Sequence, residues 1–174
     1  MKKINLQLFG ESVQGKQIIY LYRVLNEEAT ENGTLIAFVT ENSRSASKDS
    51  ESTVTKDGAI RTPGAAEVEI SSTSILAKGD TLIARLEKAM NDDEIIEIWE
   101  VNLAEPATEE NKFKGRYYQG YLTEFEQTSS SEEAVECSLT FGINGTGADG
   151  DVTVTTAQQE IANYTFKDTA KTGA

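Results

Sequence analysis

Few side chains in this sequence could carry out chemistry. The 174 residues include no histidine. This excludes serine–histidine and cysteine–histidine nucleophile pairs, histidine metal ligands and the commonest general base. The single cysteine, Cys137, can form neither an internal disulfide nor a multi-cysteine zinc site. Apolar and polar residues alternate around it, so we interpret it as a buried strand residue and not as a nucleophile.

Oxygen ligands for a metal ion are the next candidates. Asp149 and Asp151, with Asn144 nearby, supply part of a calcium-binding loop, but the closing glutamate is missing. The same stretch, residues 142–150, is rich in glycine but lacks the lysine and hydroxyl residue that complete a phosphate-binding loop. We therefore interpret it as a glycine–aspartate turn. The sequence predicts no enzyme, no metal site and no cofactor.

Acidic side chains gather in one region of the chain. An adjacent pair such as Asp92 and Asp93 supports acid–base catalysis only when a cleft brings carboxylates together, and we expect this pair to face water. An acidic run without basic residues is typical of a solvated surface. Residues 91–111 form such a run, with eight acids: Asp92, Asp93, Glu94, Glu97, Glu100, Glu105, Glu109 and Glu110.

Charge and length define the class of protein. The formal net charge is −13, from 29 acidic and 16 basic residues. This balance argues against ordinary binding to nucleic-acid phosphates, which depends on clustered Lys and Arg. No stretch approaches the roughly 18 apolar residues of a membrane helix, and the start of the chain is too polar for a signal peptide. We expect one soluble domain over residues 1–174, synthesised in a cytoplasm, with a flexible tail at 167–174.

The hydrophobic pattern predicts a mainly β fold with one helix. Residues 81–90 carry an apolar stripe at helical spacing after Asp80, a candidate N-cap. Residues 34–40 are apolar on both faces, which predicts a strand buried on both sides or packed on a neighbouring subunit. Gly115 and Gly120 are expected to mark bulges. Strands are expected at residues 16–25, 34–40, 65–75, 94–103, 113–126, 135–141 and 152–154. Tight turns between consecutive strands favour an antiparallel β-sandwich or open barrel.

A long polar segment separates two of these strands. Residues 41–64 contain four acidic residues, four basic residues and five serines. A loop beyond roughly 12–15 residues in a compact domain is functional or disordered. Within it, Asp57-Gly58 favours the tight turn of a hairpin between residues 52–56 and 59–62. Because an isolated hairpin is marginal in water, we expect this protruding arm to become ordered only against another molecule. The alternative is a solvated loop.

Four features follow one another along the chain. They are the start MKKINLQLFG, the arm with its SRSASKDSES and TKDGAIRT segments, the helix after Lys78-Gly79-Asp80 with the Trp99 strand behind it, and the passage from Gly115 to VECSLTFGINGTG. This order covers about three-quarters of the chain and resembles that of the major tail (tail tube) proteins of long-tailed bacteriophages. The tubes of type VI secretion systems share the architecture, but the extended arm and the start fit a phage better.

The resemblance implies a β-sandwich with one flanking helix, assembled as hexameric rings that stack into the tail tube of the virion. It implies that DNA passes through the tube without specific binding. The implied partners are other copies of the chain and the tape-measure, tail-terminator and distal tail proteins. The arm would reach an adjacent ring, and the residues expected to make that contact are Ser43, Arg44, Ser45, Lys48, Asp49, Lys56, Asp57 and Arg61.

Part of the negative charge is expected to face the lumen of such a tube, where it would repel the phosphates of a passing duplex. The competing interpretation is a monomeric, adhesin-like binding module whose arm grips a ligand. Electron microscopy of the concentrated protein distinguishes the two, since only the first predicts rings or tubes. The candidate lumen acids are Asp92, Asp93, Glu94, Glu124, Glu126 and Glu136.

Overall fold

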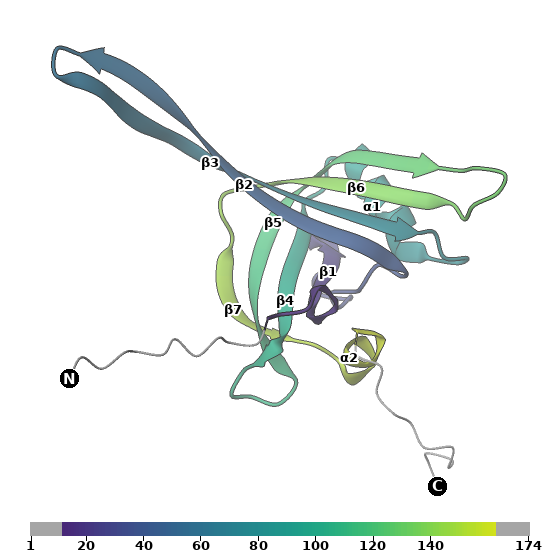
Figure 1. The fold of residues 1–174 in the computed structure, drawn as a ribbon. Helices are drawn as coiled ribbons and strands as arrows, with labels where there is room; N and C mark the ends of the chain where they lie inside the picture. Colours follow the sequence, from purple (N-terminus) through teal and green to yellow (C-terminus); the bar gives the residue numbers. More distant parts are fainter. Residues whose placement is uncertain (1–11, 163–174) are drawn as a thin grey trace, which may run out of the picture.

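A computed structural model describes residues 12–162, in which antiparallel β-structure predominates as predicted (Figure 1). The expected tail at 167–174 and most of the start of the chain lie outside these residues. The elements are 3-10 helix η1 (Gly15–Gln17), β1 (Ile18–Val24), 3-10 helix η2 (Leu25–Glu27), β2 (Val39–Thr55), β3 (Gly58–Ile75), α1 (Thr81–Asn91), β4 (Ile96–Pro106), β5 (Lys112–Thr128), β6 (Glu136–Ile143), β7 (Ala148–Thr153) and α2 (Thr156–Ala162).

The strands form one sheet in the order β1-β4-β5-β6-β3-β2, and β7 also pairs with β5. Every pairing is antiparallel. β6 lies along residues 120–128 of β5, and β7 continues along residues 112–117 of the same strand. Between them, Asn144 N donates to Gln119 O over 2.7 Å. β6 and β7 therefore act as one strand with a glycine-rich interruption.

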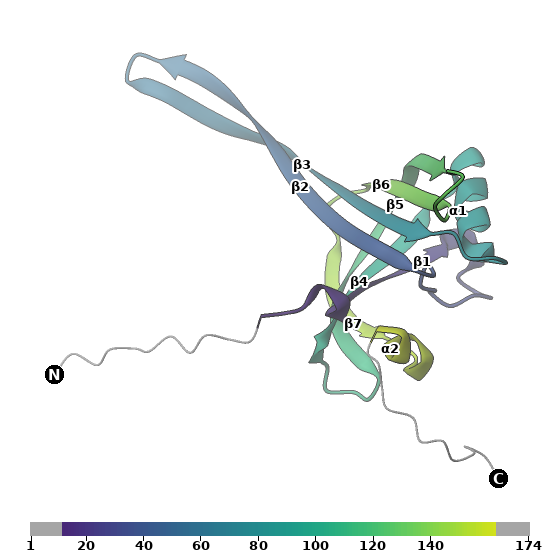
Figure 2. The same ribbon diagram turned by 45° about the vertical axis from the view of Figure 1, so that its right-hand side comes forward.

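The sheet curls on itself, which confirms the predicted open-barrel character (Figures 1 and 2). β1 and β6 are separated by two strands in the sheet order, yet the rings of Tyr22 and Phe141 stack with centroids 5.3 Å apart. Similarly, Arg44 of β2 donates to Glu100 of β4 over 2.7 Å. Such contacts between strands that are not sheet neighbours are possible only if the two ends of the sheet approach each other.

Helix α1 closes the larger core. The predicted N-cap is confirmed, since one carboxylate oxygen of Asp80 accepts from Leu82 N over 2.8 Å and from Ile83 N over 3.4 Å. The apolar stripe packs inward as expected, and Leu86 and Ala89 are fully buried. The stripe belongs to one cluster with side chains from β1, β3, β4, β5 and β6. Packing in this cluster holds α1 and the strands of the curled sheet together.

A second, smaller core lies on the other face of β1 and β4. It contains Ile19, Leu21, Val101, Leu103 and Val154. The chain after β7 covers it and continues into α2, where the side chain of a glutamine donates to a loop carbonyl. The expectation of a single helix was therefore wrong. α2 spans only seven residues, TAQQEIA, which is too short and too polar to give a clear helical stripe.

The strand predicted for residues 34–40 was also wrong, except for its last two residues. Only Thr34 makes an isolated bridge, to Tyr22, and β2 begins at Val39. Between them Phe38 adopts a positive φ of 50° and leaves 70% of its surface exposed. The chain therefore turns within this apolar run, which does not pair as a strand before Val39. Periodicity could not reveal this, because the turn uses a residue type that rarely adopts a positive φ.

The two strand glycines serve close packing. Gly115 borders a register irregularity between β4 and β5, whereas the irregularity between β5 and β6 lies at Leu122/Glu124 and not at Gly120. A Cβ atom on Gly115 would lie 2.6 Å from Glu100 O, and one on Gly120 would collide with the carbonyl oxygen of Gly142. The bulge expected at Gly120 is therefore wrong. Both positions need glycine because a neighbouring backbone approaches closely.

The polar segment forms a longer hairpin than predicted. β2 and β3 pair from Val39–Ser74 to Thr55–Gly58 around a turn at Lys56 and Asp57, with irregularities near both Thr40 and Asp49. β6 pairs with β3 only over residues 68–75. Beyond that limit the two strands continue as a ribbon that projects from the body in both views (Figures 1 and 2).

Candidate assembly surfaces

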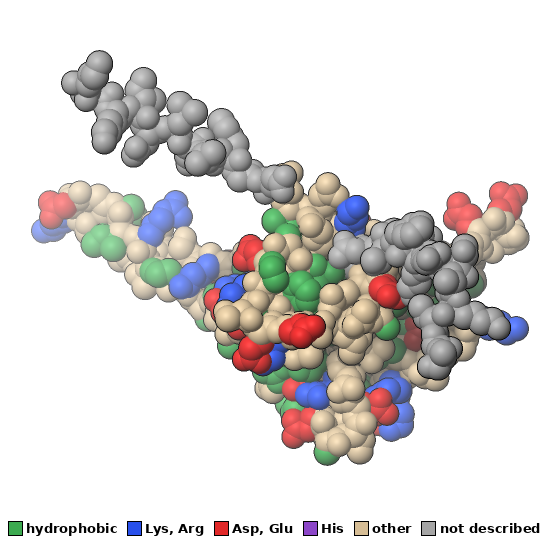
Figure 3. Space-filling view, turned by 90° about the horizontal axis from the view of Figure 1, so that it is seen from below, with side chains coloured by type: hydrophobic (Ala, Val, Ile, Leu, Met, Phe, Trp, Pro, Cys, Tyr) green, Lys and Arg blue, Asp and Glu red, His purple; other side chains and the backbone are tan. Residues whose placement is uncertain are grey.

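The projecting ribbon has exposed apolar side chains. Val54 is 83% exposed and Ile60 is 60% exposed. Val54 pairs with Ala59, and Ile60 pairs with Thr53, the residue before Val54. Because successive residues of a strand point to opposite faces, Val54 and Ile60 lie on opposite faces of the ribbon. Figure 3 shows apolar, basic and acidic side chains along the arm. A surface of this mixed kind can bind a partner on either side.

The eight predicted arm residues lie along this ribbon at different distances from the core. Ser43, Arg44 and Ser45 are at its root, where they pair with β3 residues that also pair with β6. Lys48 and Asp49 lie at the second register irregularity, and Lys56 and Asp57 form the tip turn. Arg61 donates to Ser50 Oγ over 3.2 Å. The hairpin brings these residues into one element but not into one patch.

The outer face of the sheet at β2, β3, β6 and the end of β5 is polar and acidic. Its side chains follow the cross-strand rows Glu41–Thr73–Ser138–Glu126 and Ser43–Ser71–Thr140–Glu124. The opposite face of the same strands carries Ile70, Leu139, Phe141 and other residues of the larger core. Strand alternation places six acids and no Lys or Arg on the outer face within the described residues. The acids of this acidic face are Glu41, Glu67, Glu69, Glu124, Glu126 and Glu136.

Three of these six were lumen candidates from the sequence, namely Glu124, Glu126 and Glu136. The other three, Glu41, Glu67 and Glu69, were missed. Alternation within residues 65–75 does indicate that Glu67 and Glu69 share a face. That this face continues across β6 to β5 depends on the strand order, for which the sequence gives no signal.

The remaining candidates, Asp92, Asp93 and Glu94, lie in the turn between α1 and β4. Asp92 forms an ion pair of 3.0 Å with Lys88, Asp93 has a positive φ of 54°, and Glu94 accepts from Asn26 over 2.6 Å. Helix α1 packs on the core side of the sheet, away from the acidic face. The structure therefore does not bring these three acids together with the other three.

The strands of the acidic face end in two open edges. At one end, β2 pairs with β3 and, within the described residues, with no other strand. At the other end, β4 accompanies β5 only as far as Gly120. In the part of the chain that the structure describes, residues 121–128 of β5 therefore pair with β6 alone. Unpaired N–H and C=O groups at such edges are ready to bind another strand.

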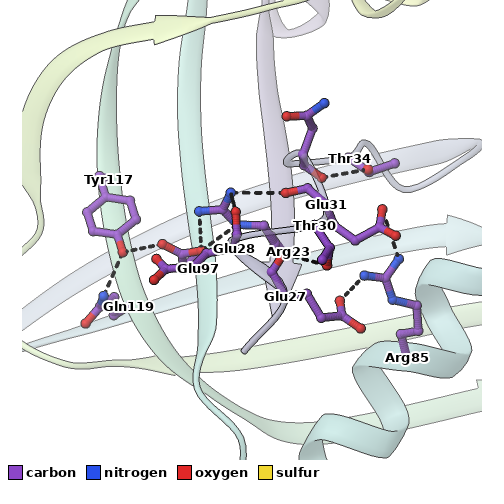
Figure 4. Close-up of polar contacts among 11 residues, drawn as sticks. Arg23, Glu27, Glu28, Thr30, Glu31, Thr34, Arg85, Glu97, Tyr117 and Gln119 are labelled. Atoms are coloured by element: carbon purple, nitrogen blue, oxygen red, sulfur yellow. Dashed lines mark hydrogen bonds and ion pairs between the residues drawn. The ribbon is translucent and has the colours of Figure 1, made fainter. Parts of the chain in front are cut away.

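A polar cluster links β1, β4 and β5 (Figure 4). Glu97 is 4% exposed, and Arg23 Nε donates to it over 2.6 Å while the guanidinium lies 5.0 Å from the Trp99 ring centroid. The hydroxyl of Tyr117 donates to the same carboxylate over 2.7 Å, and Gln119 donates to Tyr117. Burial and the bond to Glu97 raise the pKa of the Tyr117 hydroxyl. Since the buried charge is paired and hydrogen bonded, the cluster is structural.

The other groups considered for chemistry have structural partners. Asp149 pairs with Arg116, and Asp151 pairs with Lys114 over 2.6 Å, so both carboxylates of the suspected calcium loop form cross-strand ion pairs. The thiol of Cys137 is buried, which raises its pKa. Within residues 12–162 no group of three potential acidic, thiol or imidazole metal ligands occurs. No helix in the described part of the chain is long and apolar enough to cross a membrane.

Comparison with known proteins identifies the family. A family model described as phage tail tube protein matches residues 12–149. The chain belongs to this family. As a tail tube protein it is a structural subunit of the tail of a phage virion, which confirms the expectation drawn from the order of its motifs.

Individual relatives agree with this assignment. A protein of Staphylococcus phage phiMR25, named as a candidate tail protein, is 30% identical over 161 residues, which cover 90% of this chain and 82% of that protein. The SPP1 tail tube structure has the same fold, with a TM-score of 0.71, 19% identity and coverage of 94% of this chain and 95% of that one. The tail of a gene transfer agent, refined with C6 symmetry, matches with a TM-score of 0.57, 14% identity and coverage of 79% and 98%.

Proposed function

We propose that this tail tube protein forms closed rings by joining the β2 edge of one subunit to the residue 121–128 edge of β5 in the next. The two edges are different surfaces of the molecule, and such heterologous contacts generate rings when the rotation closes. The direction of the strands supports this pairing. β2, β3, β6 and β5 alternate in direction, so β2 of the next subunit would continue the antiparallel pattern beyond β5.

The acidic face then lines the lumen. An edge-to-edge array of these strands presents one continuous face inward, and the other face carries the cores. Carboxylates repel DNA phosphates, so the genome would pass without adhering. On this proposal the lumen acids are Glu124, Glu126 and Glu136 from the sequence-based set, joined by Glu41, Glu67 and Glu69. Asp92, Asp93 and Glu94 lie elsewhere.

The arm joins successive rings. Its two exposed apolar side chains and its equal numbers of acids and bases suit contact with another copy of a strongly acidic protein. Rings of six are supported by the C6 symmetry of the gene transfer agent tail. The role is structural, without a catalytic step. Partners at the ends of the tube would be the terminator and distal tail proteins, with the tape-measure protein inside it.

The two open edges carry this proposal, and electron microscopy tests it. Negative staining of the concentrated protein is expected to show rings or tubes. Featureless monomers would contradict it and favour the binding-module interpretation. Assembly is expected to be easier at about 0.15 M salt than at very low salt, because screening over about 8 Å weakens repulsion among the carboxylates.

The lumen assignment needs its own experiment. Glu67→Lys with Glu69→Lys, on the acidic face but on the inner strand β3 and away from both edges, should leave tubes intact but slow or block genome release. The matched control, Asp92→Lys with Asp93→Lys, should release DNA normally. Genome release is measured on phages that carry each variant. Normal release with the first pair and a block with the second would show that the acids near α1 line the channel instead.

A further inference from the structure

One ion pair connects the root of the arm to a strand at the other end of the sheet. Arg44 lies on β2, the last strand in the sheet order, and Glu100 lies on β4, the second. Arg44 Nε donates to Glu100 Oε2 over 2.7 Å. The hydroxyl of Tyr20, on β1, donates to the same oxygen over 2.7 Å. Three strands that are not all sheet neighbours therefore meet at one carboxylate.

This pair is more protected than the other ion pairs near it. The side chains of Arg44 and Glu100 are 33% and 20% exposed, whereas those of Lys114 and its partner Asp151 are 57% and 39% exposed. The bond to Glu100 raises the pKa of Arg44, whose guanidinium is always charged in proteins. Partly buried ion pairs with a second hydrogen bond are screened less by water and salt than exposed ones.

At this point β2 itself adds no side chain to the larger core, although Ile70, its partner on β3, is buried there. A hollow of about 220 Å³ separates the root of β2 from β4, β5 and β7. Arg44 and Glu100 both line it, together with Arg116 and other residues of these strands. Arg116 lies opposite Glu100 in the register, but it binds Asp149. Arg44 therefore spans a gap that side chains do not fill.

This contact lies at the root of the arm, where it can control the direction of the whole ribbon. Ala46, two residues beyond Arg44, lies opposite Val68, and Val68 is the last β3 residue paired with β6. The register irregularity at Lys48–Ser50 follows directly. Arg44 is thus tied to the body just before the ribbon leaves the sheet. A small rotation at the root would move the tip by a large distance.

We propose that Arg44 and Glu100 form a latch that sets the direction in which the arm leaves the subunit, so that the tip of the arm meets a second copy of this chain in the adjacent ring. The inference rests on the proposed function. Both residues are positioning residues, because they act through the ribbon and not by touching the partner. This differs from the sequence-based expectation that Arg44 contacts the adjacent ring directly.

The direction of the arm can be measured on the free subunit. In a Cys137→Ala background, spin labels are placed at Ala65→Cys, at the end of the root, and at Thr108→Cys, in the β4–β5 loop. Pulsed electron paramagnetic resonance should give a narrow distance distribution for otherwise wild-type protein. Arg44→Met and Glu100→Gln should each broaden or shift it. Unchanged distributions in both variants would overturn the latch.

Rescue and assembly separate positioning from general damage. The exchange Arg44→Glu with Glu100→Arg should restore the narrow distribution and tube formation, and Arg44→Lys does the same if the exchange does not fold. The single variants should raise the concentration needed for tubes by roughly tenfold, equivalent to about 1.4 kcal/mol. The control Lys114→Met, which breaks the exposed neighbouring pair, should change neither readout.

Glu100→Gln decides between the latch and a direct contact, because it leaves Arg44 in place and free to reach a neighbour. Loss of tubes in this variant supports the latch. Normal tubes in Glu100→Gln with loss in Arg44→Met would overturn the latch in favour of direct contact by Arg44. If wild-type protein forms no tubes, the proposed function fails, while the distance measurement still decides whether the pair orients the arm.

Discussion

The two halves of the β2–β3 hairpin differ in their surroundings although both are paired strands. Near the body, β3 buries Val68 and Ile70 in the core and pairs with β6 on its other side. Beyond the irregularity at Lys48–Ser50, neither strand pairs with a third one among residues 12–162, and every residue is exposed. Pairing between β2 and β3 is therefore similar in both halves, whereas the supporting core and the third strand are present only near the body.

This difference indicates where each half obtains its stability. A ribbon of two strands is marginal in water because it buries little apolar surface. The root is stabilised by the core of its own subunit. We therefore expect the tip, residues 50–63, to be stabilised by contacts outside the subunit, in line with the prediction from the serine-rich composition of the arm.

The largest effect is expected when the tip is removed. Replacing residues 50–63 by a two-residue Asn-Gly turn should leave a folded subunit, because no core side chain is lost. It should abolish tubes, because the proposed contact between rings would be lost. Circular dichroism and negative-stain microscopy measure the two outcomes. Tubes of normal length from this variant would contradict the role given to the arm.

A core substitution, by contrast, should reduce the stability of the folded subunit. Leu86 is fully buried on α1, so Leu86→Ala should reduce the free energy of unfolding by roughly 2–5 kcal/mol. Chemical denaturation followed by circular dichroism gives the value. An unchanged midpoint would mean that the stripe of α1 does not form the core.

Hydrogen exchange should show the boundary between the halves directly. In the free subunit, amides of residues 50–63 should exchange with opening free energies near zero, while those of β6 approach the stability of the whole domain. In assembled tubes the tip amides should become protected, because a partner orders them at a cost in conformational entropy. Equal protection of tip and root in the free subunit would show that the ribbon is stable alone.

The smallest effect on folding is expected from trimming the tip side chains. Val54→Ala with Ile60→Ala should change the free energy of unfolding by no more than about 0.5 kcal/mol, as for other exposed positions. The same pair should raise the concentration needed for tubes if the tip is buried in the assembly. Light scattering against concentration measures this. Matched assembly curves for variant and wild type would place the contact elsewhere on the arm.

Local patterns predicted the parts of the fold that depend on neighbours in sequence. The N-cap at Asp80, the stripe of α1 and the alternation around Cys137 each correspond to a feature of the structure. Predictions failed where distant segments decide the conformation. Phe38 turns a corner because β2 must start beside β3, and Gly120 faces the backbone of β6.

The candidate site shows the same division. Composition and a turn signal led to the prediction that the arm binds a partner, and the resemblance to tail tube proteins led to the prediction of an acidic lumen. The sequence could not say which acids share a face, because Glu67 and Glu124 come together only through the order β3-β6-β5. Nor could it show that Arg44 turns back to its own subunit, since its partner Glu100 is 56 residues away.

The irregularity at Lys48–Ser50 also has a mechanical consequence. A curled sheet with two cores resists deformation, whereas a two-stranded ribbon bends and twists easily about a break in its register. A tail made of such subunits would consist of stiff rings, which we call discs, connected by flexible arms. Curvature of the tail would be taken up between discs, and the bore through each disc would keep its diameter while the whole tail flexes.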